Sequence, residues 1–243
     1  MLVYRLYLVW FTIGCILVGF SLIPPWLEWA NSVFLILAGL IAVRYAMHAF
    51  GNVKGLLMSI FIWIVTFSVE GLSAYFNVFF GNYDYTDRFP PLLFGVPIGI
   101  GFAWIVMVMA GHALTIRLKH RFSRAFFAAL YVVLLDLILD PVAFVAKQYW
   151  IWEDNSAYYG IPASNFIGWF VVAFILQLFL PRTRKNEPNV NMIKQMRVVF
   201  WTIVILFLWI AILSKLYLAF FVGVIGFLLL QFIRGAANDS QKI

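Results

Sequence analysis

Apolar and polar residues alternate along this chain over stretches of about 20 residues, the length that a helix needs to cross the hydrocarbon core of a bilayer. The apolar stretches lie near residues 6–23, 30–47, 55–80, 92–116, 123–147, 163–180, 197–213 and 216–233. Short polar connections separate them, which leaves no room for a soluble domain. The pattern predicts an all-α polytopic membrane protein with about eight transmembrane helices, forming a single integral membrane domain over residues 1–243.

The number of spans depends on the last two stretches. Only Ser214 and Lys215 interrupt them, and no proline stands between them, so seven spans is the alternative. The first stretch follows Arg5, as a signal peptide would, but Pro24 and Pro25 follow it instead of a small-residue cleavage site. We therefore expect a retained first helix.

Composition supports the membrane assignment, because 65% of the 243 residues are hydrophobic and only 11% are charged. Soluble domains carry about 25% charged residues. The net charge of +7 could indicate a nucleic acid partner, but the basic residues alternate between connections and form no single patch. We therefore expect no nucleic acid partner, and the lipid bilayer as the surroundings of the chain.

The basic residues also predict an orientation, because connections on the cytoplasmic side are rich in Lys and Arg. With a cytoplasmic N-terminus, all but three of the 17 basic residues lie inside. The inner set is Arg5, Arg44, Lys54, Arg117, Lys119, Arg121, Arg124, Arg182, Arg184, Lys185, Lys194, Arg197, Arg234 and Lys242, and the outer set is Arg88, Lys147 and Lys215. We expect two cytoplasmic termini, a cytoplasmic loop over residues 181–196 and a multi-pass protein of the cytoplasmic (plasma) membrane.

Three acids stand inside the apolar stretches, where ionisable residues are costly and point to function. They are Glu70, Asp136 and Asp140, and helix geometry places all three between the midplane and the outer surface. Asp136 and Asp140 are four residues apart and share a helix face. Two close carboxyls in a low dielectric do not both ionise easily, so we expect at least one to be a neutral proton donor.

A structural role is the alternative for each of these acids. Each could hydrogen-bond a neighbouring helix, with Asn165, Tyr75 or Ser73 as its partner. The lone DLILD motif also resembles half of the magnesium-diphosphate site of membrane prenyltransferases, although the companion aspartate-rich motif is missing.

The two outer connections, residues 81–91 and 148–162, are rich in Tyr and Trp. Each leads into a stretch with a proline and, seven residues later, a tryptophan: Pro97 with Trp104, and Pro162 with Trp169. This predicts a weak repeat of helix pairs three-four and five-six. The aromatic rings could stabilise a carbocation, although Tyr and Trp also collect at membrane interfaces in general.

The chain is poor in metal ligands and thiols. Cys15 is alone, which excludes a disulfide or a cysteine-ligated metal within one chain. His48, His112 and His120 are expected near the cytoplasmic end, which excludes a histidine-rich di-iron oxygenase. We expect no metal and no cofactor.

Four segments resemble the carotenoid biosynthesis membrane protein family that includes bisanhydrobacterioruberin hydratase and carotenoid 1,2-hydratase. They are Glu70-Gly71, the run GNYDYTDRFPPLLFGVP with Trp104 downstream, DLILDPVA, and YYGIPASNFIGWF. The resemblance spans residues 65–172, the expected catalytic core. The stretch Asn155-Ser156-Ala157 departs from the family pattern, which has a glycine there, and this bears on the substrate.

The resemblance implies a cofactor-independent hydratase that adds water to the terminal C=C of an acyclic carotenoid ψ-end, with other carotenoid biosynthesis enzymes as further partners. One carboxyl among Glu70, Asp136 and Asp140 would protonate the alkene and another would direct water, and the sequence does not decide which. The expected substrate-binding residues are Tyr83, Tyr85, Trp104, Trp150, Trp152, Tyr158, Tyr159, Asn165 and Trp169. The alternatives are a carotenoid end-group cyclase or isomerase, a membrane prenyltransferase, and a small proton-coupled transporter.

Overall fold

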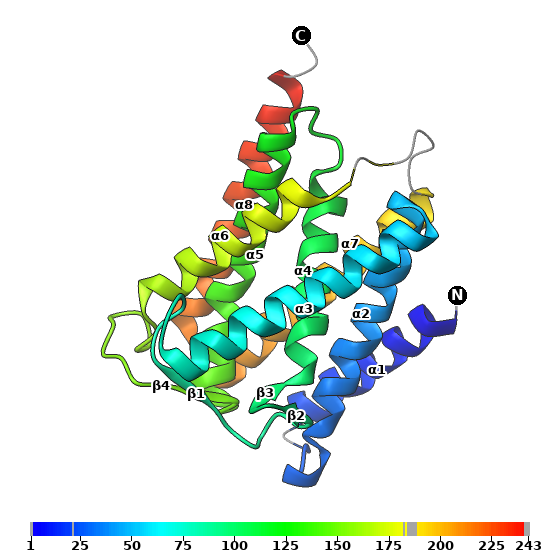
Figure 1. Ribbon diagram of the computed structural model, residues 1–243. Coiled ribbons are helices and arrows are strands. Elements are labelled where there is room, and N and C mark those ends of the chain that lie inside the picture. Colours follow the sequence, from blue (N-terminus) through cyan, green and yellow to red (C-terminus); the bar gives the residue numbers. More distant parts are fainter. Residues whose placement is uncertain (1, 21, 182, 184–188, 241–243) are drawn as a thin grey trace.

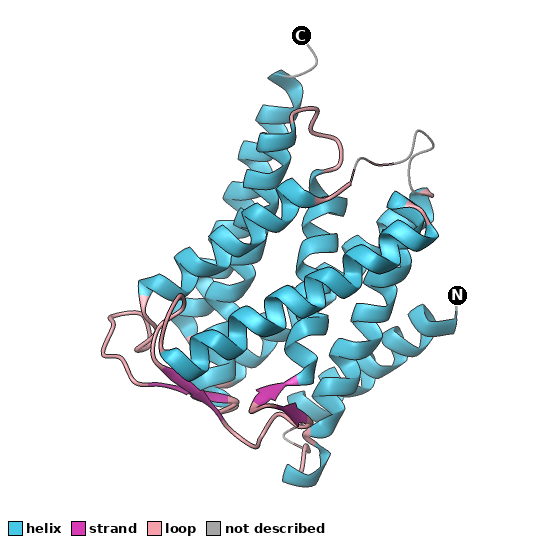
Figure 2. Ribbon diagram, viewed as in Figure 1, coloured by secondary structure: helices cyan, strands magenta, loops and turns pink. Residues whose placement is uncertain are grey.

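The computed structural model describes residues 2–20, 22–181, 183 and 189–240. Within these residues the chain forms a bundle of eight α-helices, with short strands gathered at one end (Figures 1 and 2). The helices are α1 (Leu2–Gly19), α2 (Trp29–Phe50), α3 (Asn52–Phe76), α4 (Ile98–Thr115), α5 (Arg121–Pro141), α6 (Ala163–Phe179), α7 (Val190–Leu213) and α8 (Tyr217–Ser240). The prediction of an all-α polytopic membrane protein is confirmed.

Seven of these eight helices are long and apolar enough to cross a membrane. The exception is α6, which is apolar but has only 17 residues. The last two helices do not merge, because α7 ends at Leu213 and Lys215 takes a left-handed conformation with φ +60° before α8 begins. A short polar interruption is therefore enough to turn the chain.

Two expected stretches are longer than the helices that they contain. The helix in 55–80 ends at Phe76, because Asn77 takes a left-handed conformation with φ +56°. The helix in 92–116 starts only at Ile98, after strands β2 (Leu92–Leu93) and β3 (Val96–Pro97). Pro97 caps α4 in an extended conformation and lacks the N–H that an earlier helical turn would need.

The loop expected over 181–196 is shorter than predicted. Helix α7 begins at Val190, where the side chain of Asn189 accepts a hydrogen bond from the backbone N–H of Asn191. Polar residues of the first turns of α7 gave the sequence its loop-like composition. Residues 182 and 184–188 of this segment lie outside the described residues.

Strands β1 (Tyr83–Tyr85) and β4 (Trp150–Trp152) join the two outer connections as an antiparallel ribbon. Tyr83 pairs with Trp152 and Tyr85 with Trp150. We call this end of the bundle, which also carries β2 and β3, the strand end (Figure 2). The ribbon brings together segments that are almost 70 positions apart in the chain.

Helix α4 forms the centre of the bundle and α1 lies at its edge (Figure 1). Of the apolar window of α4, 89% is buried inside the protein, against 6% for α1. Helices α2 and α3 approach closely at Gly55, where an added Cβ would lie 2.4 Å from the backbone of Ala46. Small residues allow such close helix packing in membranes.

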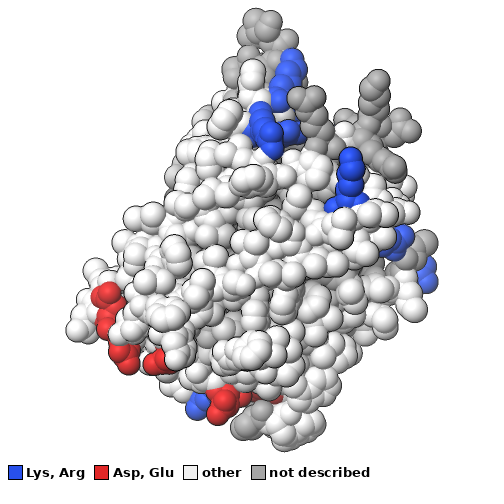
Figure 3. Space-filling view, viewed as in Figure 1, with Lys and Arg blue, Asp and Glu red and all other residues white. Residues whose placement is uncertain are grey.

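Charges separate along the bundle. Figure 3 shows Lys and Arg gathered at the end opposite the strands, and Asp and Glu near the strand end with one basic group beside them. This separation agrees with the charge pattern of the sequence, and the orientation with cytoplasmic termini stays a prediction. Of the basic residues behind it, Arg182, Arg184, Lys185 and Lys242 lie outside the described residues.

Candidate active site

A cavity of about 310 Å³ lies near the strand end, and helices α1 to α7 and the β1–β4 ribbon contribute to its walls. All three intramembrane acids line it: Glu70 from α3, and Asp136 and Asp140 from α5. None of them is more than 3% exposed. The fold therefore brings together at one cavity the acids that the sequence singled out.

Glu70 has hydrogen-bond donors on both carboxyl oxygens. Its Oε1 accepts the indole N–H of Trp104 at 2.9 Å, and its Oε2 accepts the hydroxyls of Tyr83 and Tyr85 at 2.9 Å each. Burial, and next the charge of Glu70, raise the pKa of both phenols, so they remain donors. Because three donors converge on it, Glu70 is surrounded as a carboxylate would be.

Asp140 is surrounded in the same way. Its Oδ1 accepts the indole N–H groups of Trp150 at 2.6 Å and Trp152 at 3.0 Å, and its Oδ2 accepts the amide of Asn165 at 2.7 Å. The two tryptophans alternate along β4 and therefore point to the same side of the strand. These contacts also fit an ionised carboxyl.

Asp136 differs from the other two acids. Its Oδ2 accepts the amide of Asn165 at 3.0 Å, but its buried Oδ1 has no partner in the protein. Leaving a buried polar atom unpaired costs about 1–3 kcal/mol. Such an unpaired atom needs an explanation, and here it belongs to a side chain that lines the cavity.

The two tryptophans that follow the prolines meet in the protein. Trp104 and Trp169 stack with ring centroids 4.4 Å apart. Trp169 lines the cavity, whereas Trp104 lies outside the cavity lining and donates to Glu70. Helices α3 and α4 supply Glu70 together with its indole donor Trp104, whereas the indoles that donate to Asp140 come from β4, so the expected repeat stays a prediction.

Most expected substrate-binding residues line the cavity, namely Tyr83, Tyr85, Trp150, Trp152, Asn165 and Trp169. Tyr158 and Tyr159 lie outside its lining. The hydroxyl of Tyr158 donates to the carbonyl of Leu137 at 2.6 Å, and that of Tyr159 accepts the backbone N–H of Ala219 at 3.2 Å. These two tyrosines tie the connection to α5 and α8, which their composition alone did not reveal.

Of the three structural partners considered for the acids, Asn165 is the one that contacts them. Tyr75 is 82% exposed, so it faces outward from α3. The hydroxyl of Ser73 instead donates to the carbonyl of Val78 and receives the backbone N–H of Phe80. Ser73 therefore closes the turn after α3.

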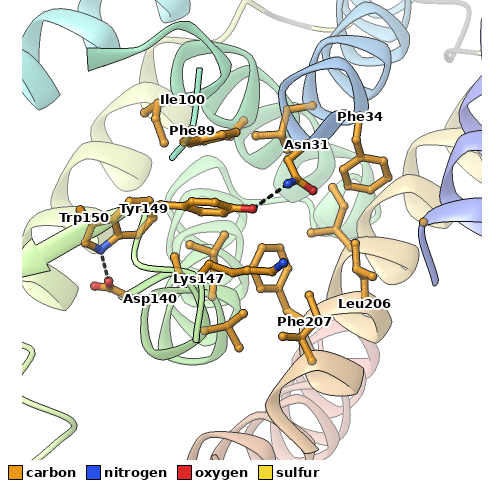
Figure 4. A pocket seen from close by; sticks show the side chains of 18 of the residues that line it. Asn31, Phe34, Phe89, Ile100, Asp140, Lys147, Tyr149, Trp150, Leu206 and Phe207 are labelled. Atoms are coloured by element: carbon orange, nitrogen blue, oxygen red, sulfur yellow. Dashed lines mark hydrogen bonds between the residues drawn. The ribbon is translucent and has the colours of Figure 1, made fainter. Parts of the chain in front are cut away.

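A second polar cluster reaches the cavity and was not anticipated. The hydroxyl of Tyr149 donates to Glu28 at 2.9 Å, and the amide of Asn31 lies 2.7 Å from both groups. Lys147 forms an ion pair with Glu28, with Nζ and Oε1 3.6 Å apart. Asn31, Lys147 and Tyr149 line the cavity (Figure 4). The sequence signal for this cluster is the presence of two opposite charges, Glu28 and Lys147, each at the outer end of an apolar stretch.

The wall opposite the acids is apolar and comes from α1 and α7, whose role in the site the sequence also did not indicate. Its residues are Trp10, Phe11, Ile13, Gly14, Leu17 and Val18 of α1, and Ile203, Leu206, Phe207 and Ile210 of α7. Apolar residues suit lipid and cavity equally, so no motif marks them. The cavity thus joins an acidic region to a hydrocarbon-like wall.

Metal ligation has little support in the described residues. They contain no group of three or more His, Cys, Asp or Glu side chains arranged to hold a metal ion. The Nδ2 group of Asn165 donates to both aspartates, and two indole N–H groups donate to Asp140; these donor groups do not coordinate cations.

Comparison with known protein families matches the chain to the carotenoid biosynthesis protein family over residues 30–231. No curated protein and no solved structure matches. The matched range covers most of the chain and contains all three acids and the ribbon that surrounds them. This chain therefore belongs to the carotenoid biosynthesis protein family.

Proposed function

We propose that the protein is a carotenoid hydratase that adds water to the terminal C=C of an acyclic carotenoid ψ-end. The observation that carries the proposal is the contrast among the three acids. Glu70 and Asp140 each accept three hydrogen bonds, whereas Asp136, which also lines the cavity, keeps an unpaired oxygen. An alkene offers no polar atom to such a group, but it can accept a proton from it.

The cavity suits an apolar substrate with one reactive end. Its polar groups concentrate around the acids and the Glu28 cluster, while α1 and α7 supply only apolar lining. A hydrocarbon chain can therefore lie against α1 and α7 with its end group at the carboxyls. The family assignment supplies the pathway to which such a substrate belongs.

In the proposed mechanism Asp136 is the proton donor. We assign the proton of the resting state to its Oδ1, since this buried oxygen accepts no hydrogen bond from the protein. Transfer of the proton to the less substituted alkene carbon breaks the π bond and leaves a tertiary cation at the other carbon. Asp136 becomes a carboxylate, and the Asn165 amide on its Oδ2 stabilises the new charge.

Water then completes the reaction. Its oxygen bonds to the cationic carbon, and Asp140 takes the released proton, giving a tertiary alcohol. The Asn165 amide contacts both aspartates, so a proton has only a short path back to Asp136. The side chains of Lys147 and Glu28 are 19% and 21% exposed, which gives water a polar route to the cavity. The sum of these steps is the addition of one water to one alkene, with the proton returned to Asp136, and it requires no cofactor.

The surroundings favour the cation between these steps. Two carboxylates, Glu70 and Asp140, lie at the cavity without a neutralising cation in direct contact among the described residues. The rings of Tyr85, Trp150 and Trp169 line the same space. Cation–π contacts contribute about 0.5–2 kcal/mol each, more when desolvated.

A carotenoid end-group cyclase is the second candidate, and the deep burial of the acids favours it. At 1–3% exposure they have little contact with bulk water, and a cation that meets no water closes a ring or loses a proton. The first steps would be the same. Only the fate of the cation differs.

The test is expression in cells that accumulate lycopene or another acyclic carotenoid, followed by mass analysis of the extracted pigments. Hydration adds the mass of one water per modified end. An isomeric product of unchanged mass would support the cyclase instead. Unmodified pigment across acyclic carotenoids of several chain lengths would contradict both.

A further inference from the structure

The α1 wall of the cavity reaches the surface of the protein. Ile13 lines the cavity and is nevertheless 51% exposed, so one side chain borders both the interior and the bilayer-facing surface. Tyr7 is the one residue of α1 that is fully buried. Its hydroxyl bonds Thr202 of α7 at 2.7 Å, and Trp10 bonds the carbonyl of Ala30 at 3.0 Å. These contacts hold α1 toward its N-terminal half.

Beyond these contacts the wall contains a gap at Gly14. This residue lines the cavity, and a Cβ added to it would meet no atom within 4 Å. Gly39 in the neighbouring α2 is different, because an added Cβ there would lie 2.6 Å from the ring of Phe102. The packing is therefore open at Gly14 and tight inside the bundle. We call the space beside Ile13 and Gly14 the lateral mouth.

The size of the cavity indicates what passes through this mouth. A volume of about 310 Å³ is near the lower end of the roughly 300–1,000 Å³ that enclose drug-sized ligands. A long polyene does not fit within it when its end group lies at the acids. The rest of the chain must leave the protein somewhere.

The polarity of the lining distinguishes two routes by which the polyene could leave the cavity. The route past Glu28 and Lys147 would press hydrocarbon against an ion pair, which costs desolvation energy. The route past Ile13 and Gly14 is apolar and faces the region where lipid chains lie. It is also continuous with the space at the carboxyls, since one cavity includes both.

We propose that the lateral mouth at Ile13 and Gly14 of α1 admits the polyene from the bilayer and that its far portion stays among the lipid chains during the reaction. This inference rests on the proposed function and adds to it the way the substrate is held. The protein then recognises one end group and ignores the far end. A carotenoid with one acyclic and one ring-closed end is therefore modified at its acyclic end.

The test narrows the mouth with G14L and uses G235L as the matched control. Both glycines lie in helices, and an added Cβ meets no atom within 4 Å at either. The two substitutions therefore bring the same gain in helix propensity, but only G14L fills the mouth. Each protein is purified in detergent from carotenoid-producing cells, and the retained pigment, the retained phospholipid and the thermal unfolding are measured.

Pigment retention and hydrated product should both fall by about tenfold or more in G14L, and G235L should match the wild type. Wild-type retention and product in G14L would overturn the lateral mouth. If G14L unfolds early, I13W narrows the same opening from the surface side and should give the same loss. Phospholipid retained in place of pigment by the wild type, and lost in G14L, would overturn the polyene as occupant.

Pigment retention also separates this inference from the proposed function. A wild type that binds pigment without hydrating it would refute the hydratase. The comparison of G14L with G235L in the retention assay would still show whether the pigment binds through the lateral mouth.

Discussion

Replacing Asp136 by asparagine separates catalysis from folding in this site. The amide oxygen introduced by D136N can accept the Asn165 hydrogen bond that Oδ2 accepts now. The amide nitrogen takes the place of Oδ1, which has no partner to lose. The fold should therefore be almost unaffected, while the proton that starts the reaction is gone.

The expected loss of activity is large. General acid catalysis contributes about 10²–10⁴-fold, or roughly 3–5 kcal/mol at 1.36 kcal/mol for each factor of ten. D140N is the comparison, because Asp140 accepts three hydrogen bonds on two oxygens and an amide has only one acceptor oxygen. The D140N variant must therefore lose at least one hydrogen bond to a charged group, which is worth about 1.5–3 kcal/mol of folding stability.

The assay measures the ratio of hydrated to unmodified carotenoid in producing cells, together with thermal unfolding of each purified variant. D136N should unfold like the wild type and make almost no hydrated product. D140N should lose both product and stability. A wild-type product ratio in D136N would remove Asp136 as the donor, and a D140N protein of undiminished stability would refute the ionised state assigned to Asp140.

Three further substitutions test other parts of the site and the fold. W104F removes one donor from Glu70 but keeps a ring for stacking, so hydration should fall by about tenfold with expression unchanged, measured by pigment analysis. G55A places a methyl group 2.4 Å from the backbone of Ala46 and should destabilise the protein by about 1–3 kcal/mol in thermal unfolding, with G235A, whose added methyl group meets no atom within 4 Å, as the control without this clash. Y149F removes one hydrogen-bond partner from the Glu28 carboxylate and one from the Asn31 amide, and it should destabilise the protein by about 1–3 kcal/mol in the same measurement. For each of the three variants, a wild-type value would refute the contact that the substitution tests.

The sequence predicted the helices and the acids because both obey simple rules. Helical spans need long apolar runs, and a carboxyl within such a run is costly enough to stand out. The helix ends were less predictable, since left-handed residues such as Asn77 and Lys215 end helices without a strong compositional signal.

The rest of the site was hidden for physical reasons. The hydrogen-bond inventory that distinguishes Asp136 from Asp140 depends on the pairing of β1 with β4, a long-range contact that no local pattern encodes. The cluster around Glu28 joins residues more than 100 positions apart in the same way. The wall from α1 was invisible because a lipid-facing and a cavity-facing apolar residue look the same in sequence.

The β1–β4 ribbon makes the surroundings of the two carboxylates interdependent. Tyr83 and Tyr85 on one strand and Trp150 and Trp152 on the other turn toward the acids, while Asp84 and Ile151 between them face outward. Because the side-chain period of a strand is two, a slip of one residue in either strand would exchange inward and outward positions. Two of the three donors of the acid served by that strand would be withdrawn in a single step. The register of these six residues therefore keeps the hydrogen-bond donors of both strands directed at Glu70 and Asp140.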